Sequence, residues 1–373
     1  MTEQVTRTRA VDVPPAVTVA SWVSWWKAIV AVIILGLATG GALAITHHPA
    51  HVPAHLASPR TLRATPATFE LRTVATLELP NPTNAVAADA ALWVVGGDTG
   101  ALAEIDPVRG TITRQVRLPH SADYVAAMPG SDSLWVASTS ANLLMKIDRA
   151  SLTVTRTLHS TASAPLDQPV GIIATPDGVW VTNYGSKPST ALEIDDQSGA
   201  VTRVVTLPGT QATGPVTVQI DGTYAWFLIG SAHRIVSVGT HSQAYAGIAA
   251  EDTCGQVQNV YGLMITTSGA DPTCHGPTRQ VDELGYTSGR LYGLGLDLDS
   301  AAAAGGQAWA SDHSRTLYVI DPNTGDATQA ATLERPSTLN RLVGTHDAIW
   351  VLRGRTNQLL KLIPFARAPA AKS

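Results

Sequence analysis

The triplets Leu92-Trp93-Val94 and Leu134-Trp135-Val136 share one pattern, a tryptophan held between two apolar residues. The same apolar setting recurs at Trp180, Trp226, Trp309 and Trp350. The gaps between successive tryptophans are 42, 45, 46, 83 and 41 residues, and 83 is close to twice the shortest gap. One copy of the repeat therefore lacks its tryptophan. A repeat of this length is typical of proteins built from stacked or radially arranged units.

A second motif, an isoleucine followed by an aspartate, comes about twelve residues after most of these tryptophans and precedes a turn. It is present at Asp106, Asp148, Asp195 and Asp321. An aspartate at the start of a tight turn caps that turn with its own side chain. The short β-branched segments between the turns predict three to four antiparallel strands per unit, with the tryptophan on the second. Consecutive apolar residues in the tryptophan strands predict that both faces of each sheet are covered, as in the blades of a β-propeller.

The length of the repeat region gives the number of units. Thr73 to Phe365 spans 293 residues, which divides into seven units of about 42. The segment at Leu263 stands for the missing tryptophan strand, and Val281 stands for its Ile-Asp motif. The last unit ends near Ile363 without a fourth strand, whereas Thr73–Pro80 is a lone strand before the first unit. We therefore expect an all-β, seven-bladed propeller in which the N-terminal strand completes the last blade and leaves no open edge.

The unit that lacks a tryptophan contains both cysteines of the chain, Cys254 and Cys274. Two cysteines are too few for a disulfide scaffold, and their spacing is not that of a zinc or redox motif. They can form one bridge in an oxidising compartment. We expect a Cys254–Cys274 disulfide that ties down the unit with the weakest packing signal.

The N-terminal region predicts export. Residues 28–45 carry no charge, and together with Trp25 and Trp26 they reach the length that a helix needs to cross a bilayer. Basic residues precede this segment, and none follows it before Arg60, which favours a cytoplasmic N-terminus. A cleaved signal peptide with a site at 42–44 is the alternative, and it exports the same remainder.

These patterns divide the chain into a cytoplasmic tail (1–21), a transmembrane signal anchor (22–46), a stalk rich in proline and histidine (47–67), the propeller (68–366) and a C-terminal tail (367–373). We therefore expect a single-pass protein of the plasma membrane with an extracytoplasmic propeller. Gly36 and Gly40 lie on one face of the anchor, which gives the hypothesis that the anchor dimerises.

Units with the order Leu-Trp-Val, Ile-Asp-Pro and Leu-Pro resemble the exported seven-bladed propellers of the YVTN/NHL-like superfamily, over residues 73–365. Its enzyme member is the streptogramin B lyase. The resemblance implies that a lyase of this kind would use a Glu-x-His arrangement in the propeller together with a divalent metal. No glutamate in this chain is followed two positions later by histidine. The resemblance therefore implies the fold and a binding or scaffolding role in the cell envelope. A divalent-metal-dependent lyase or hydrolase with its site at the propeller channel is the alternative.

Composition limits the partners. The net charge of −4 provides no basic face for nucleic acid, and we expect no nucleic-acid partner. Only 14% of the residues are charged, against about a quarter in ordinary soluble domains. The sequence contains no standard short catalytic motif, so no catalytic residue and no cofactor is predicted.

Propellers usually vary in the loop after the strand that carries the repeated tryptophan. We expect these loops to form a binding face. The loop-face candidates are Asn183, Tyr184, His233, Arg234, Asp312, His313, Arg315, Arg353 and Arg355. If these loops share one face, their cationic residues can hold an anion or a carboxylate. The expected partner is an envelope protein, a glycan or a small ligand.

Overall fold

The computed structural model describes residues 69–162, 165–185, 188, 190–207, 215–220, 224–229, 234–240, 245–249, 256–260, 263–267, 279–281, 292–293, 298–312, 316–320, 327–333 and 340–366. The chain divides into two compact units, Met1–Ala54 and His55–Ser373, and the described residues belong to the second. The expected anchor (22–46), the stalk and both cysteines lie outside them. Among the described residues, no helix combines the length and the apolarity that crossing a membrane requires.

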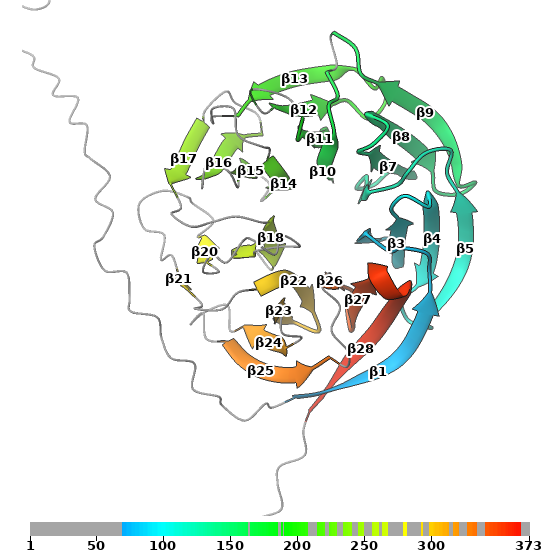
Figure 1. Cartoon of the computed structure of the whole chain (residues 1–373), viewed down its shortest axis with the longest axis vertical. Helices are drawn as coiled ribbons and strands as arrows, with labels where there is room; N and C mark the ends of the chain where they lie inside the picture. Colours follow the sequence, from blue (N-terminus) through cyan, green and yellow to red (C-terminus); the bar gives the residue numbers. More distant parts are fainter. Residues whose placement is uncertain are drawn as a thin grey trace, which may run out of the picture. The chain divides into compact units, whose positions relative to one another are not determined.

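The described strands form four-stranded antiparallel sheets, the blades of a propeller, and within most blades the four strands follow one another in sequence (Figure 1). The first three blades contain β2 (Asn84–Ala88), β3 (Ala91–Gly96), β4 (Ala101–Asp106) and β5 (Thr111–Arg117); β6 (Tyr124–Ala127), β7 (Ser133–Ser138), β8 (Leu143–Asp148) and β9 (Thr153–His159); and β10 (Pro169–Thr175), β11 (Gly178–Asn183), β12 (Thr190–Ile194) and β13 (Val201–Thr206).

The following blades have the same order. They contain β14 (Pro215–Ile220), β15 (Tyr224–Ile229), β16 (Arg234–Gly239) and β17 (Tyr245–Ala249); β18 (Gln256–Val260), β19 (Leu263–Thr267), β20 (Arg279–Val281) and β21 (Tyr292–Gly293); and β22 (Leu298–Ala304), β23 (Gln307–Asp312), β24 (Thr316–Ile320) and β25 (Ala327–Thr332). The segments at Leu263 and Val281 thus form the second and third strands of their blade, as the sequence predicted.

The last blade joins the two ends of the repeat region. Its strands run in the order β1 (Phe69–Glu78), β28 (Gln358–Ala366), β27 (Ile349–Arg353) and β26 (Asn340–Gly344). A short 3-10 helix, η2 (Gly354–Thr356), connects β27 to β28. Strand β1 pairs antiparallel with β28 from Phe69↔Ala366 to Glu78↔Gln358, and Figure 1 shows the two strands side by side. This pairing confirms the expected use of the N-terminal strand, which begins four residues earlier than Thr73.

In the blades whose four strands follow one another in sequence the first strand is the innermost, and in the last blade the innermost strand is β26 (Figure 1). These inner strands contact one another in the order β2, β6, β10, β14, β18, β22 and β26, and β26 contacts β2. The contacts therefore return to the blade where they began. An arrangement of this kind leaves short, protected edges, which is how propellers avoid edge-to-edge association.

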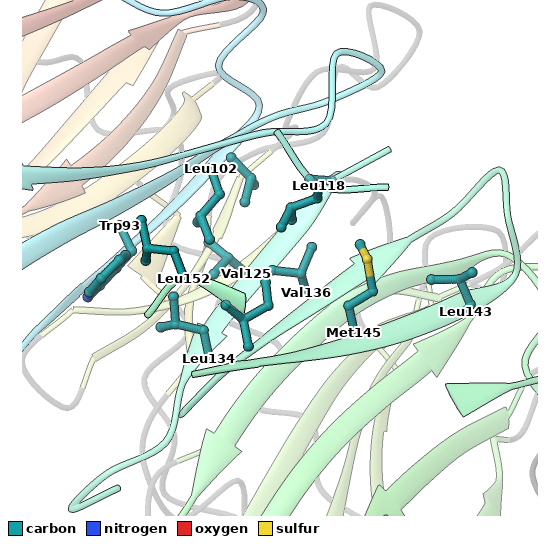
Figure 2. Packing of buried hydrophobic residues seen from close by; sticks show 12 residues of the cluster. Trp93, Leu102, Leu118, Val125, Leu134, Val136, Leu143, Met145 and Leu152 are labelled. Carbon is teal, nitrogen blue, oxygen red and sulfur yellow. The ribbon is translucent and has the colours of Figure 1, made fainter. Parts of the chain in front are cut away.

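The tryptophans fill the interfaces between blades. Trp93 lies in one buried cluster with Leu134, Val136 and Met145 of the next blade (Figure 2). Trp350 of the last blade lies in a cluster with Leu92 and other residues of β2–β5. The six repeat tryptophans are at most 3% exposed. Burying each large aromatic side chain between two sheets stabilises the fold by about 2–3 kcal/mol, and the predicted packing role is confirmed.

The Ile-Asp turns join the third strand of a blade to the fourth, and the expected side-chain caps are present. The Oδ1 atom of Asp106 accepts hydrogen bonds from the amides of Val108 and Arg109. Asp148 and Asp195 accept equivalent bonds from Ser151 and Ser198. These hydrogen bonds hold the pKa of all three carboxyl groups below the usual value.

Arginines of the fourth strand connect each of three blades to the turn of the next blade. Arg203 donates hydrogen bonds to the carbonyl oxygens of Gly239 and Thr240 at 2.9 and 3.1 Å. It also forms an ion pair with Glu193 at 3.1 Å and lies over the ring of Trp180. Arg114 and Arg156 reach the next turn in the same way, at the carbonyls of Arg149, Ala150, Gln197 and Ser198.

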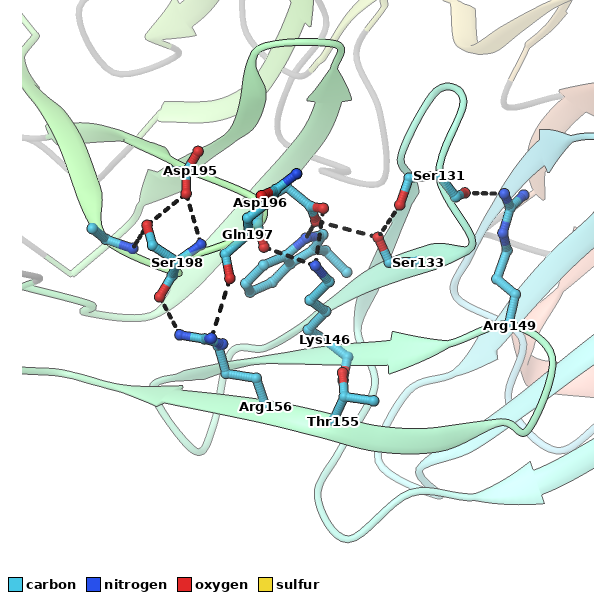
Figure 3. Close-up of polar contacts among 12 residues, drawn as sticks. Ser131, Ser133, Lys146, Arg149, Thr155, Arg156, Asp195, Asp196, Gln197 and Ser198 are labelled. Carbon is cyan, nitrogen blue, oxygen red and sulfur yellow. Dashed lines mark hydrogen bonds and ion pairs between the residues drawn. The ribbon is translucent and has the colours of Figure 1, made fainter.

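One turn carries a further contact between blades (Figure 3). Asp196 accepts a hydrogen bond from Nε1 of Trp135 at 2.7 Å and forms an ion pair with Lys146 at 2.9 Å. Ser133 donates to the same carboxylate at 3.2 Å. The turn of one blade thus satisfies the buried polar groups of the preceding blade, so adjacent blades are held by polar contacts as well as by apolar packing.

Candidate functional site

Loops that follow the second strand of each blade lie at the same end of the sheets as the connectors that lead from one blade to the next. We call the surface formed by these loops and connectors the loop face. It follows from the antiparallel strand order, in which the second and fourth strands end at one side. In the first three blades and in the last blade, hydrogen bonds join the described loop residues to a neighbouring connector.

An asparagine clamp recurs on the loop face. Asn142 and Asn357 each lie seven residues after their tryptophan and have positive φ values of 54° and 57°, a conformation that asparagine tolerates better than most residues. The Oδ1 atom of Asn142 accepts the amide of Gln168 at 2.7 Å, and that of Asn357 accepts the amide of Asn81 at 2.8 Å. Both acceptors fix the connector to the next blade.

Further contacts connect the loops of the first and second blades to their connectors. Asn81 donates from Nδ2 to Asp98 at 2.7 Å. Asp123, in the connector before β6, accepts hydrogen bonds from the amide of Thr139 and the hydroxyl of Ser121. Because loops and connectors are bonded in this way, the described part of the loop face is a preorganised surface, which lowers the entropic cost of binding.

Three of the predicted site residues end second strands, rather than lying in loops. Asn183, Asp312 and Arg353 each come three residues after a tryptophan and are the last residues of β11, β23 and β27. Asn183 is fully buried: its Oδ1 accepts the amide of Asp167, and its Nδ2 donates to Pro165 and Thr190. Arg353 is 7% exposed. The Asn183 side chain thus holds the connector at Pro165–Asp167 in place, and the Arg353 side chain is buried.

Asp312 supports its own loop in the same way. It accepts hydrogen bonds from the amide of Thr316 at 2.7 Å and from the hydroxyl of Tyr318 at 2.8 Å. Partial burial and the adjacent carboxylate raise the pKa of Tyr318 to about 12. The phenol therefore stays protonated and continues to donate throughout the neutral range.

Tyr184 and Arg355 are the predicted residues that the structure places on the surface. Tyr184 is 39% exposed, an uncommon exposure for a large aromatic side chain, and Arg355 is exposed in η2. Arg234 begins β16, and its side chain lies outside the described part. His233, His313 and Arg315 lie outside the described residues, so their expected roles stay predictions.

Sequence reasoning missed a group on the inner strands. Tyr124 begins β6 and Arg341 is the second residue of β26, so both lie at the loop-face end of innermost strands. Burial lowers the pKa of the Arg341 guanidinium and raises that of the Tyr124 phenol, although both side chains are partly exposed. Protein therefore packs around most of each side chain, and part of its surface remains accessible to solvent. Alignment of the repeats on their tryptophans could have found both residues.

Within the described part of the chain, no cluster of three or more His, Cys, Asp or Glu side chains has a geometry that could hold a metal ion. Four histidines of the repeat region, at 233, 241, 275 and 313, lie outside that part.

Comparisons with known proteins show the class of fold. No protein-family profile matches the chain, and no curated protein matches it by sequence. Virginiamycin B lyase from Staphylococcus aureus has a similar structure with a TM-score of 0.63, 15% identity, and coverage of 79% of this chain and 99% of that chain. The Cps50 (Swd1) β-propeller domain of Myceliophteria thermophila matches with a TM-score of 0.60 and 10% identity, over 79% and 99% of the two chains.

The WD40 repeats of RRP9 match with a TM-score of 0.60 and 12% identity, over 82% of this chain and all of that chain. At these identities the similarity defines a β-propeller and carries no activity from the neighbours. This chain is similar in fold both to streptogramin B lyase-like propellers and to WD40 propellers.

Proposed function

We propose that this protein is a seven-bladed β-propeller, anchored in the plasma membrane by residues 22–46, that binds a component of the cell envelope through its loop face. The observation that carries the binding role is the clamped loop face with Tyr184 exposed on it. Exposed aromatic side chains on a rigid surface are typical anchors of protein–protein contacts, because they lose little conformational entropy on binding. The inner strands contact one another in a sequence that returns to β2, which supports the count of seven blades.

Binding through the loop face can be tested by replacing Tyr184 with a photo-crosslinking amino acid in the full chain, in the cells that produce it. The matched control is Val108, which is 75% exposed on the turns at the other end of the blades. We expect a discrete crosslinked product from position 184 and none from position 108. Products from position 108 alone, or none from either position, would contradict a loop-face binding role.

Support for the anchor comes from the apolar segment, the asymmetry of basic residues and the interfacial tryptophans. The test is labelling of intact cells with a membrane-impermeant maleimide, comparing Ala10→Cys with Val108→Cys against the background of the natural cysteines. Labelling at 108 without labelling at 10 is expected. Labelling at both positions, or only at 10, would refute this orientation. An unreactive background also supports the Cys254–Cys274 disulfide, since a bridged pair cannot react.

A metal-dependent lyase or hydrolase is the competing function, favoured by the similarity in fold to virginiamycin B lyase. Native mass spectrometry of the full chain, released from detergent after purification without chelator, separates the two. A stoichiometric divalent ion that is lost on replacing His233 or His313 supports the enzyme. A metal-free chain that still crosslinks through position 184 supports the binding module.

A further inference from the structure

Two pairs of neighbouring inner strands are joined by a side chain that accepts a backbone amide of the next inner strand. Asn84 of β2 accepts the amide of Val125 in β6 at 3.2 Å, and Ser300 of β22 accepts the amide of Leu342 in β26 at 2.9 Å. Both acceptors are buried. Each acceptor occupies one position of the repeat, two residues before the residue that pairs with the blade's tryptophan.

Arg341 occupies this same position in the last blade, since Val343 pairs with Trp350. The next inner strand is β2, which β26 contacts. By the repeat, the amide that corresponds to Val125 and Leu342 is that of Ala85. A guanidinium group has donors and no acceptor, so Arg341 cannot accept this amide as Asn84 and Ser300 accept theirs. By the repeat, two groups of hydrogen-bond donors therefore face each other where the pairs β2–β6 and β22–β26 have a donor and an acceptor.

Nothing in the described part of the chain compensates the charge of Arg341 by a hydrogen bond or an ion pair. Tyr124 is the one group that contributes electrostatically to the pKa of Arg341 among the described residues. It occupies the same repeat position on β6, two residues before Ala126, which pairs with Trp135. Strands β6 and β26 both contact β2, so Tyr124 and Arg341 lie at the loop-face ends of the two strands that flank it. The charge of Arg341 lowers the pKa of Tyr124, against the larger effect of burial, which raises it. The phenol remains protonated and adds a third donor.

We propose that Arg341, the amide of Ala85 and the hydroxyl of Tyr124 form a binding site for a carboxylate group at the loop-face end of the inner strands. A carboxylate has the planar, two-oxygen geometry that accepts paired hydrogen bonds from a guanidinium, and it supplies both the missing acceptor and the missing negative charge. The group belongs either to a free small organic acid or to an acidic side chain of a bound peptide. These groups belong to inner strands, whereas Tyr184 and Arg355 follow second strands. Binding of a carboxylate at the inner strands is therefore tested independently of binding through the loops.

Thermal unfolding of the full chain in detergent tests the site, with sodium acetate titrated against sodium chloride at equal ionic strength. A ligand that binds only the folded state raises the unfolding temperature as its concentration exceeds the dissociation constant. We expect acetate to raise it beyond the effect of chloride. Arg341→Gln should weaken the apparent affinity at least tenfold, and Tyr124→Phe by a smaller factor. Arg109→Gln, which removes an arginine whose side chain is 80% exposed on a turn at the other end of the blades, should leave the response unchanged.

A second arm identifies the source of the group, using an acetylated, amidated tetrapeptide that contains one glutamate. Stabilisation by acetate alone indicates a free acid, and stabilisation by the tetrapeptide at lower concentration indicates a peptide. If Arg341→Gln does not fold, Arg341→Lys keeps the charge without the paired geometry, and it should weaken the acetate response. Equal responses to acetate and chloride in the unaltered protein, or an undiminished acetate response in both Arg341 variants, overturn the proposal.

Discussion

Replacing Asp196 with alanine should destabilise the propeller strongly, although Asp196 lies in a turn. The change leaves Nε1 of the fully buried Trp135 without its acceptor, which costs about 1–3 kcal/mol. It also removes the counter-charge of Lys146, whose side chain is 18% exposed. Lys146 keeps its 2.8 Å bond to the carbonyl of residue 196, so this loss is about 1 kcal/mol. The total is on the order of 2–4 kcal/mol.

Urea unfolding of the full chain, followed by tryptophan fluorescence, measures this change. Asp132→Ala is the matched control, because Asp132 also pairs with a basic residue but its side chain is 88% exposed; that change should cost less than about 0.5 kcal/mol. Asp196→Asn retains an acceptor for Trp135 and should lie between the two. If Asp196→Ala cost no more than Asp132→Ala, the turn would not hold the preceding blade, and the reasoning about blade contacts would be wrong.

Three further predictions concern other polar contacts of the blades. Arg203→Met should reduce the free energy of unfolding by about 2–4 kcal/mol in the same assay, because it strands Glu193 and releases two carbonyls of the next turn; a cost below that of Asp132→Ala would count against this role. Asp148 has a depressed pKa, chiefly through Ser151, so its contribution to stability is present above the unfolded value of 3.8 and is lost as pH falls through the lower folded value. The gap in unfolding midpoint between the unaltered protein and Asp148→Asn should therefore be constant above about pH 5 and shrink below about pH 4, whereas a constant gap down to pH 2 would exclude this linkage. Tyr318 has a raised pKa, so its contribution is present below the unfolded value of 10.0 and is lost as pH rises through about 12; absorbance titration of Tyr318→Phe should lack one phenol that ionises near pH 12, and an unchanged curve would refute the assignment.

Most of the fold could be predicted from the sequence, because each blade repeats the residues that determine it. The tryptophan strand and the Ile-Asp turn recur at fixed spacing, and the lone strand at Thr73 matches the strand that the last unit lacks. The sequence also predicts the second strand of the unit without a tryptophan, at Leu263. These features depend on local pattern and on the closure of sheet edges, both of which a sequence displays directly.

The candidate site was harder to predict, since burial there depends on contacts between blades. Asn183 comes three residues after Trp180, where the sequence predicts a loop. In the structure it ends the strand, and its side chain bonds to the connector at Pro165 and Asp167. Arg341 was missed because it lies within an apolar strand and becomes distinctive only when the repeats are aligned in register. Arg203 was missed for a similar reason: its partners at Gly239 and Thr240 belong to another blade.

Closure of the ring is the claim on which the loop face depends, and one crosslink tests it most directly. Glu78 and Gln358 are partners in the β1–β28 pairing, and their side chains are joined by a 3.1 Å hydrogen bond. Paired positions on neighbouring strands lie about 4.5–5.5 Å apart between Cα atoms, which suits a disulfide. Oxidation of the full chain carrying Glu78→Cys and Gln358→Cys should link the two peptides within a single chain, as read by mass spectrometry, while either single variant forms no such link. Links only between separate chains, or none, would contradict the closed propeller.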